Sequence, residues 1–345
     1  MKKKFLALVL ATTMAVSMAA CGENSDENAE SKVETSVGTA SQSSPDESSA
    51  NTEDYGSVVI DNNGREITFT KMPERVISMN IQATEMMLAL GLEDKLIGTS
   101  YNNCEVLPEY KEAFDQIPIL SDTYSSHEVI IGQEPDFVIG RNTAFTEKAS
   151  GSIEQFDAVG IPAYQAKGTI VSGRPEVMDD VYEDISSLGK IFKVEDKADA
   201  LIQDMQAKID AAQKKVASVE TPLKVLVIDG LDGNEIFTAS NALESELIRL
   251  AGGQNIAPDM GKNWATISME VVTDANPDII VFNVYEDTTL EEKIAEAEAN
   301  LALQDTNAVK NKRYVGIPLT SVHESIRTAD TVQYLAENFY PELFE

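Results

Sequence analysis

A twelve-residue pattern occurs twice in this chain and limits the folds that are open to it. The first copy runs from Glu128 to Ile139 and the second from Glu270 to Val281. Both copies place Pro-Asp seven residues after the glutamate and follow it with three apolar residues. Because proline ends a helix and a short apolar run after a turn is typical of a buried strand, each copy predicts a short helix, a turn and a strand.

Other elements recur in the same order. The segment Glu85–Gly91 resembles Glu246–Gly252, each predicting a helix that ends at glycine, and Val159–Pro162 resembles Val315–Pro318. The intervals differ between the two halves, so the repeat is one of elements and not a fixed-period solenoid. The fold class predicted is α/β, with two lobes that each have a central sheet flanked by helices.

A long helix is predicted between the lobes, over residues 194–218. Its apolar positions fall on one helical face: Leu201, Ile202, Met205, Ile209 and Val216. This bridging helix separates an N-terminal α/β lobe (55–193) from a C-terminal α/β lobe (219–345), and a ligand cleft is expected between them. The alternative is a surface helix of one larger domain.

The first 21 residues are typical of a bacterial lipoprotein signal peptide. Lys2, Lys3 and Lys4 precede an apolar run, which ends in Met-Ala-Ala before Cys21. We expect Cys21 to be lipidated and to hold the protein on the outer side of the cell membrane by that anchor alone. The alternative is an ordinary cleavable signal followed by an incidental cysteine.

Residues 22–54 are predicted to be a disordered tether. This segment is rich in serine, has nine acidic residues against one lysine, and contains no aromatic residue, leucine, isoleucine or methionine. Such a composition cannot bury enough apolar surface to offset the loss of conformational entropy on folding.

Charge and residue counts exclude several classes of protein. The formal net charge is −31, and without the signal's +3 and the tether's −8 it is −26 on residues 55–345. A nucleic-acid partner is therefore not expected, because such a protein needs basic residues to neutralise phosphates. Two cysteines and two histidines leave no multi-ligand metal cage, so neither a metal site nor a resident cofactor is predicted.

The repeated units, the bridging helix, the segment Trp264–Glu270 and the C-terminal Pro341–Phe344 together resemble one family across residues 55–345. The chain resembles the substrate-binding proteins of ABC importers for ferric siderophores, haem and cobalamin. The resemblance implies two α/β lobes joined by a rigid helix and a function in transport, not an enzyme. It also implies a permease dimer with a cytoplasmic ATPase as partners, and a small-molecule metal chelate as cargo.

The resemblance assigns a role to the repeated glutamates. In this family one glutamate on each lobe docks into arginine pockets of the permease, and the matching positions are Glu128 and Glu270. The alternative is that each carboxylate has only a structural role. In the first turn of its helix it would interact favourably with the helix dipole and stabilise the helix by about 0.3–1 kcal/mol.

Ligand-binding residues are expected on the loops that follow the carboxyl ends of the strands. The candidates are Asn80, Tyr101, Tyr124, Arg141, Phe237, Trp264, Tyr285, His323 and Arg327. Trp264 could stack on a planar ligand or simply pack in the core. The two arginines could pair with carboxylates or phenolates, or only add solubility.

The resemblance implies that Tyr124 and Tyr285 stand where haem-binding relatives place axial ligands. The alternative is that both are aromatic wall residues, and His323 could be a ligand or a polar loop residue. The expected cargo is an iron chelate, either a ferric siderophore or haem, with cobalamin as the alternative. A lipid-anchored surface receptor or enzyme is the alternative of another class, although we find no nucleophile elbow, phosphate loop or zinc-protease motif.

Overall fold

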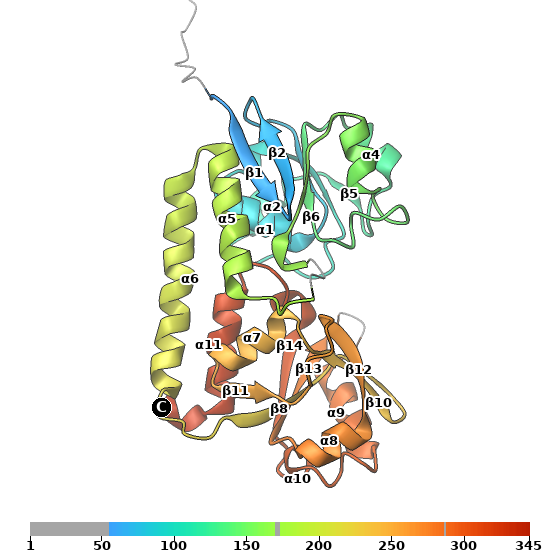
Figure 1. Cartoon of the computed structure of the whole chain (residues 1–345), viewed down its shortest axis with the longest axis vertical. Coiled ribbons are helices and arrows are strands. Elements are labelled where there is room, and N and C mark those ends of the chain that lie inside the picture. Colours follow the sequence, from blue (N-terminus) through green and yellow to red (C-terminus); the bar gives the residue numbers. More distant parts are fainter. Residues whose placement is uncertain (1–54, 170–172, 286–287) are drawn as a thin grey trace, which may run out of the picture. The chain divides into compact units, whose positions relative to one another are not determined.

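The computed structural model describes residues 55–169, 173–285 and 288–345. They belong to one compact unit, in which two parallel sheets are flanked by helices (Figure 1). The predicted α/β class is therefore confirmed. The predicted signal peptide, with Cys21, and the predicted tether lie outside the described residues. Within the described ranges, no helix is both long enough and apolar enough to cross a membrane.

Five parallel strands form the first sheet. They are β3 (Val76–Ser78), β4 (Leu96–Ser100), β5 (Ile119–Ser121), β6 (Phe137–Gly140) and β7 (Ala163–Gln165), in the order β5-β4-β3-β6-β7. Before them, β1 (Val58–Asn62) and β2 (Arg65–Phe69) form an antiparallel hairpin. Asn63 and Gly64 close this hairpin with positive φ angles of 65° and 78°, as a type I′ turn requires.

The second half of the chain has a parallel sheet and an antiparallel one. β8 (Leu223–Ile228), β11 (Gly253–Asn255), β13 (Ile279–Val284) and β14 (Tyr314–Pro318) are parallel, in the order β11-β8-β13-β14. β9 (Gly230–Asp232), β10 (Glu235–Ala239) and β12 (Trp264–Ser268) form the antiparallel sheet, in the order β12-β10-β9.

The two parallel sheets share one strand order. β4-β3-β6-β7 and β11-β8-β13-β14 each place the second, first, third and fourth strands side by side. The repeated Pro-Asp has the same structural role in both. Asp136 Oδ1 accepts a hydrogen bond from the backbone N of Arg75 at 2.8 Å, and Asp278 Oδ2 accepts one from the backbone N of Lys224 at 3.0 Å. Asp136 thus ties the start of β6 to the start of β3, and Asp278 ties the start of β13 to the start of β8.

One of the proposed sequence matches is wrong. Strand register pairs Val138 with Ala163 and Ile280 with Tyr314, so Ala163 is the equivalent of Tyr314. Residues 159–162 lie before β7, in a turn where Gly160 has a φ of 75°. Residues 315–318 lie inside β14 instead. The Val-Gly-Ile-Pro similarity is therefore a coincidence of composition.

Helices connect these strands. They are α1 (Ile81–Ala89), α2 (Lys111–Phe114), α3 (His127–Ile131), α4 (Ile153–Ala158), α5 (Met178–Phe192), α6 (Glu195–Val216), α7 (Leu243–Leu250), α8 (Met269–Ala275), α9 (Leu290–Ala299), α10 (Asn307–Lys310) and α11 (Thr328–Phe339). The sequence predicts a helix over Glu85–Gly91 that ends at glycine. α1 does end just before Gly91, but it begins earlier, at Ile81, and its first eight residues are all buried. A helix enclosed on all sides has no polar stripe to mark its boundaries.

α6 lies within the predicted range 194–218. It runs alongside α5, from the first half of the chain, and α11, from the second half (Figure 1). Met205, Ile209 and Val216 are buried as the periodicity suggested, whereas Leu201 and Ile202 are only half-buried. One apolar cluster extends from Val76 of the first sheet through Met205 to Val225 of the second. This cluster joins the two halves, and each half also has a separate buried cluster of its own, around Ile77 in the first half and Leu226 in the second.

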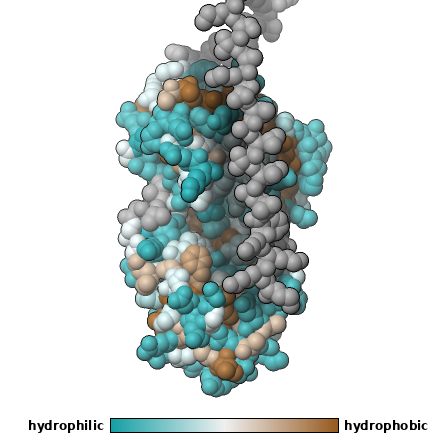
Figure 2. All heavy atoms as spheres, turned by 90° about the vertical axis from the view of Figure 1, so that its right-hand side faces the viewer, coloured by the Kyte–Doolittle hydropathy of each residue, from teal (hydrophilic) through white to brown (hydrophobic). Residues whose placement is uncertain are grey.

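The visible part of one face of the molecule is predominantly hydrophilic. Figure 2 shows one face on which polar residues cover most of the described part and hydrophobic residues appear only in small groups. This agrees with the strongly acidic composition of residues 55–345.

Candidate functional site

The residues that line or support the site follow the carboxyl ends of the parallel strands in both sheets. Asn80 follows β3, Arg141 follows β6, Asp229 follows β8 and Tyr285 follows β13. In each sheet these two strands are neighbours whose connections leave in opposite directions, the point at which open α/β sheets bind ligands. The rule that selected the candidates from sequence therefore applies in both halves.

One cavity at the site has a volume of about 460 Å³, and we call it the tyrosine pocket. Its lining comes from both halves of the chain: Tyr101, Asn103, Cys104, Val284, Tyr285, Pro318, Leu319 and Thr320. The structure thus brings two of the predicted residues, Tyr101 and Tyr285, to one cavity.

A second cavity, the tryptophan pocket, has a volume of about 380 Å³. It is lined by Arg141, Asn142, Thr143, Thr169, Glu176, Lys262, Asn263, Trp264 and His323. Three predicted residues, Arg141, Trp264 and His323, meet here.

Aromatic contacts complete both pockets. Phe237 is 42% exposed and stacks on Trp264, with ring centroids 5.9 Å apart, and Trp264 meets the His323 ring edge-on at 6.0 Å. Tyr124 stacks on Tyr101 at 4.3 Å, and its hydroxyl lies 2.7 Å from Thr143 Oγ1. Tyr124 therefore contacts one residue of each pocket.

The hydroxyl of Tyr285 is committed to a neighbouring carboxylate. It donates a 2.6 Å hydrogen bond to Asp229 Oδ1, and Lys293 Nζ lies 5.2 Å from the centre of its ring. Burial and this hydrogen bond raise the pKa of Tyr285, and burial raises that of Tyr124. Both phenols therefore keep their protons at neutral pH, whereas Fe(III) prefers phenolate.

A buried network supports Asp229 from behind. Asn283 Nδ2 donates to Asp229 Oδ1 at 3.2 Å and to Glu244 Oε2 at 3.0 Å. Glu244 is fully buried, and that burial raises its pKa to about 8. Among the described residues, no group of three or more His, Cys, Asp or Glu is placed to hold a metal ion.

Two cations line the tryptophan pocket, the largely buried Arg141 and the exposed Lys262. The Nε of Arg141 lies 3.0 Å from Glu324 Oε1, and its NH2 group donates to His323 Nδ1 at 3.3 Å. Because a guanidinium can only donate, Nδ1 accepts and the imidazole is neutral. Burial and the charge of Arg141 hold the pKa of His323 well below its ordinary value.

Four of the nine predicted ligand residues line neither pocket. Tyr124 and Phe237 stack on lining residues, as described above, whereas the polar groups of Asn80 and Arg327 are used elsewhere in the fold. Asn80 is 1% exposed, and its Oδ1 accepts a 3.2 Å hydrogen bond from the backbone N of Arg141, so it holds the end of β6 in position. Arg327 Nε donates to Glu85 Oε2 at 2.7 Å, and its NH2 group donates to the carbonyl of Glu105. The guanidinium of Arg327 is thereby occupied by an ion pair between the first and second halves of the chain.

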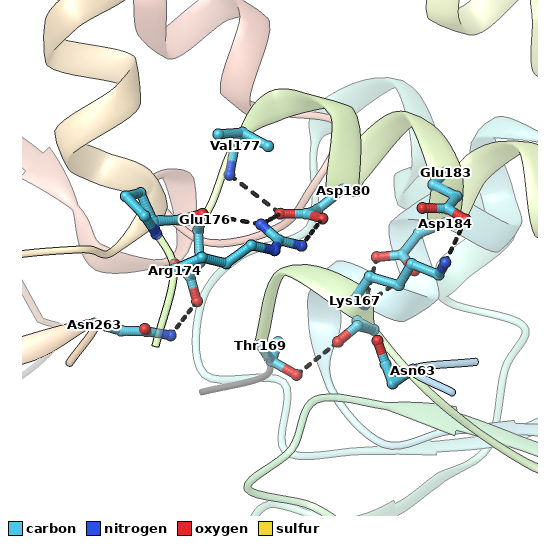
Figure 3. Close-up of polar contacts among 12 residues, drawn as sticks. Asn63, Lys167, Thr169, Arg174, Glu176, Val177, Asp180, Glu183, Asp184 and Asn263 are labelled. Carbon is cyan, nitrogen blue, oxygen red and sulfur yellow. Dashed lines mark hydrogen bonds and ion pairs between the residues drawn. The ribbon is translucent and has the colours of Figure 1, made fainter. Parts of the chain in front are cut away.

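Sequence reasoning missed Glu176, Asn263 and Thr320. Thr320 follows the end of β14, so the same strand-end rule could have found it. Glu176 comes from the segment before α5 and contacts the other half of the chain. It accepts hydrogen bonds from Asn263 Nδ2 at 2.5 Å and from the backbone N of Leu243 at 2.6 Å (Figure 3). No local pattern signals such a long-range contact.

The repeated glutamates are exposed at the starts of equivalent helices. Glu128 lies in the first turn of α3 and Glu270 in the first turn of α8. Hydrogen bonds from its own backbone N–H and from Ser126 lower the pKa of Glu128. Both side chains are therefore accessible to a partner, in equivalent places in the two halves.

The chain is similar to proteins of known class. A family model described as periplasmic binding protein matches residues 76–319. An uncharacterized ABC transporter substrate-binding lipoprotein of Bacillus subtilis, YvrC, is 25% identical over 297 residues, covering 85% of this chain and 88% of that protein. A vitamin B12-binding protein of Yersinia pestis is 25% identical over 210 residues, covering 60% and 69%.

Comparison with solved structures also finds a periplasmic binding protein. A periplasmic binding protein from Veillonella parvula superposes with a TM-score of 0.76 and 29% identity, covering 83% of this chain and 98% of that one. The family model spans well over half of the sequence and includes every lining residue of the two pockets except Thr320 and His323. The chain therefore belongs to the periplasmic binding protein family, whose members are non-enzymatic components of transport systems.

Proposed function

We propose that this protein is the lipid-anchored binding component of an ABC importer and carries a metal chelate in the cleft formed by the tyrosine and tryptophan pockets. The observation that supports this most directly is the position of the pockets. Both lie near the carboxyl ends of parallel strands, and both take lining residues from the two halves of the chain. Aromatic side chains line them, from both halves in the tyrosine pocket (Tyr101 and Tyr285) and from the second half in the tryptophan pocket (Trp264 and His323). Aromatic walls suit a large, partly planar guest.

The tyrosines favour a cargo whose metal is already fully coordinated. Tyr285 donates a hydrogen bond to Asp229, and the hydroxyl of Tyr124 lies beside that of Thr143. A ferric siderophore, in which the chelator fills the coordination sphere, needs no phenolate from the protein. Haem is supported less well, because axial coordination by tyrosine uses the deprotonated oxygen.

Cobalamin is the second candidate. The relative from Yersinia pestis is named as a vitamin B12-binding protein, and it is similar over 60% of this chain. A corrinoid also brings its own coordinating nitrogens, so the same neutral tyrosines suit it.

The cargo can be identified with the single tryptophan, Trp264. We expect titration of the full-length chain in detergent with one of four probes to quench its emission saturably at micromolar concentrations or below. The probes are ferrichrome, ferric enterobactin, haemin and cyanocobalamin. Trp264→Phe should retain binding by calorimetry and Trp264→Ala should weaken it at least about fivefold, because stacking on an aromatic contributes on the order of 1–3 kcal/mol. If none of the four probes binds, the proposed cargo class is wrong.

The lipid anchor is supported by the sequence around Cys21 and by the lipoprotein named among the relatives. Radiolabelled fatty acid fed to cells that express the protein should label the wild type. Cys21→Ser should carry no label and should appear in the culture medium or periplasm. Cys104→Ser is the matched control and should keep the label. Equal labelling of the Cys21→Ser variant would contradict the anchor.

A further inference from the structure

Arg141 separates the tryptophan pocket from a buried acid. One side of Arg141 lines the pocket, and its side chain is 18% exposed. Behind it lies Glu324, whose side chain is 4% exposed and whose Oε1 is 3.0 Å from Arg141 Nε. Glu324 also lines a small interior gap with Asn80, Gln82 and Asp184. An anion that enters the pocket must therefore compete with Glu324 for the same guanidinium.

Two further buried acids, Glu176 and Asp184, lie near Glu324. Burial raises the pKa of each to about 8, so both are mainly protonated at pH 7 and add little negative charge beside the guanidinium. Glu176, which is 9% exposed, lines the same pocket, and its carboxylate points toward Asn263 (Figure 3). Asp184 is 1% exposed and accepts hydrogen bonds from Tyr164 and from the backbone of Lys167. Burial raises the pKa of Glu324, and burial followed by the charge of Glu324 raises that of Glu176 to about 8.

The other polar groups near Arg141 and Glu324 supply no positive charge that could balance Glu324. His323 is neutral and Tyr124 is a neutral phenol, as described above. Lys262 is exposed at the rim of the pocket, where water screens its charge. Arg174, which is next to Glu176 along the segment, is paired with Asp180. Arg141 is therefore the cation that balances Glu324.

We propose that an anionic group of the cargo binds Arg141 and that Glu324 takes up one proton when it does so. This inference rests on the proposed function, because it concerns the same cleft. Before binding, the ionised Glu324 neutralises Arg141. When the anionic group pairs with Arg141, a charged Glu324 would be left buried without a counter-ion, and such a charge is neutralised by protonation. Free chain, anionic cargo and one proton thus give the complex with an uncharged Glu324.

The sign of the pH dependence follows from this balance. A binding step that takes up one proton becomes tenfold tighter for each unit by which the pH falls, as long as free Glu324 remains ionised and bound Glu324 remains protonated. A neutral chelate displaces no charge from Arg141, so its affinity should not depend on pH over the same range.

Calorimetry measures the proton directly. The full-length chain in detergent is titrated at pH 7 in phosphate and in Tris, whose ionisation enthalpies differ, so the difference in heat gives the number of protons taken up. Ferric enterobactin, haemin and cyanocobalamin, which carries a phosphodiester, are the anionic probes. Ferrichrome is the neutral probe. We expect about one proton for the anionic probe that binds and none for ferrichrome.

Glu324→Gln separates this role from a structural one. Its amide oxygen can still face Arg141 Nε, but it cannot become charged. We expect proton uptake to fall to near zero, with affinity for the anionic probe at pH 7 unchanged or increased. A residue that only supports the fold would instead lose affinity. The matched control, Glu66→Gln, changes an exposed glutamate of β2 and should behave like the wild type.

Each result decides between the proposals. Binding of an anionic probe without proton uptake by the wild-type chain overturns the role of Glu324, and so does unchanged uptake in Glu324→Gln. Binding of ferrichrome alone overturns the anion at Arg141 and leaves the transport of a chelate intact. Binding of none of the probes overturns the proposed cargo class itself.

Discussion

Replacement of Arg327 by methionine should lower the free energy of unfolding by about 3–5 kcal/mol. Arg327 pairs with Glu85, whose side chain is completely buried, and the methionine would leave that carboxylate without its counter-ion. The backbone N–H of Leu107, which donates to Glu85 Oε1 at 2.8 Å, cannot supply a full compensating charge. Urea denaturation followed by circular dichroism measures the change.

Two further variants test the explanation. Glu85→Gln combined with Arg327→Met removes the orphaned charge and should recover much of the lost stability. Lys111→Met breaks an exposed ion pair with Asp115 and should cost less than about 1 kcal/mol. If Arg327→Met costs no more than Lys111→Met, the ion pair between the two halves is not desolvated as we describe.

Charge reversal of both repeated glutamates should abolish transport and leave ligand binding intact. Glu128→Lys with Glu270→Lys reverses two exposed charges, so the fold should lose little stability. If each carboxylate docks with a cationic pocket of the permease, the lysines would repel it. We expect uptake of the cargo to fall at least a hundredfold in cells that express the variant as the sole copy.

The chain offers a matched control for this experiment. Glu154 and Glu291 are also exposed and also lie in the first turns of helices, α4 and α9. Glu154→Lys with Glu291→Lys loses the same helix-dipole contribution, about 0.3–1 kcal/mol for each site, but should transport normally. Equal uptake by both double variants would disprove docking through Glu128 and Glu270.

Much of the fold could be predicted because its signals are local. The Asn63-Gly64 turn, the Pro-Asp units and the apolar strands β4, β8 and β13 each occupy a short stretch of sequence. The repeat also located Glu128 and Glu270 in equivalent helices. The Val-Gly-Ile-Pro match failed because four small and apolar residues suit a turn as well as a strand.

The candidate site could be predicted only where it follows strand ends. That rule located Tyr101, Arg141 and Tyr285, and the tryptophan pocket contains Trp264 and His323 as expected. It did not distinguish Arg327, whose guanidinium is occupied by Glu85, from Arg141, which faces a cavity. It also missed Glu176, because the partners of that side chain are 67 and 87 residues away in the sequence.

The shared apolar cluster has a consequence for how the molecule comes apart. Val76, Met205 and Val225 belong to one core, so neither half can be exposed to water without uncovering the other. Heating should therefore melt both halves in a single cooperative transition. A chain severed near the middle of α6 would yield two fragments with incomplete interiors, which could regain a native form only by reassociating.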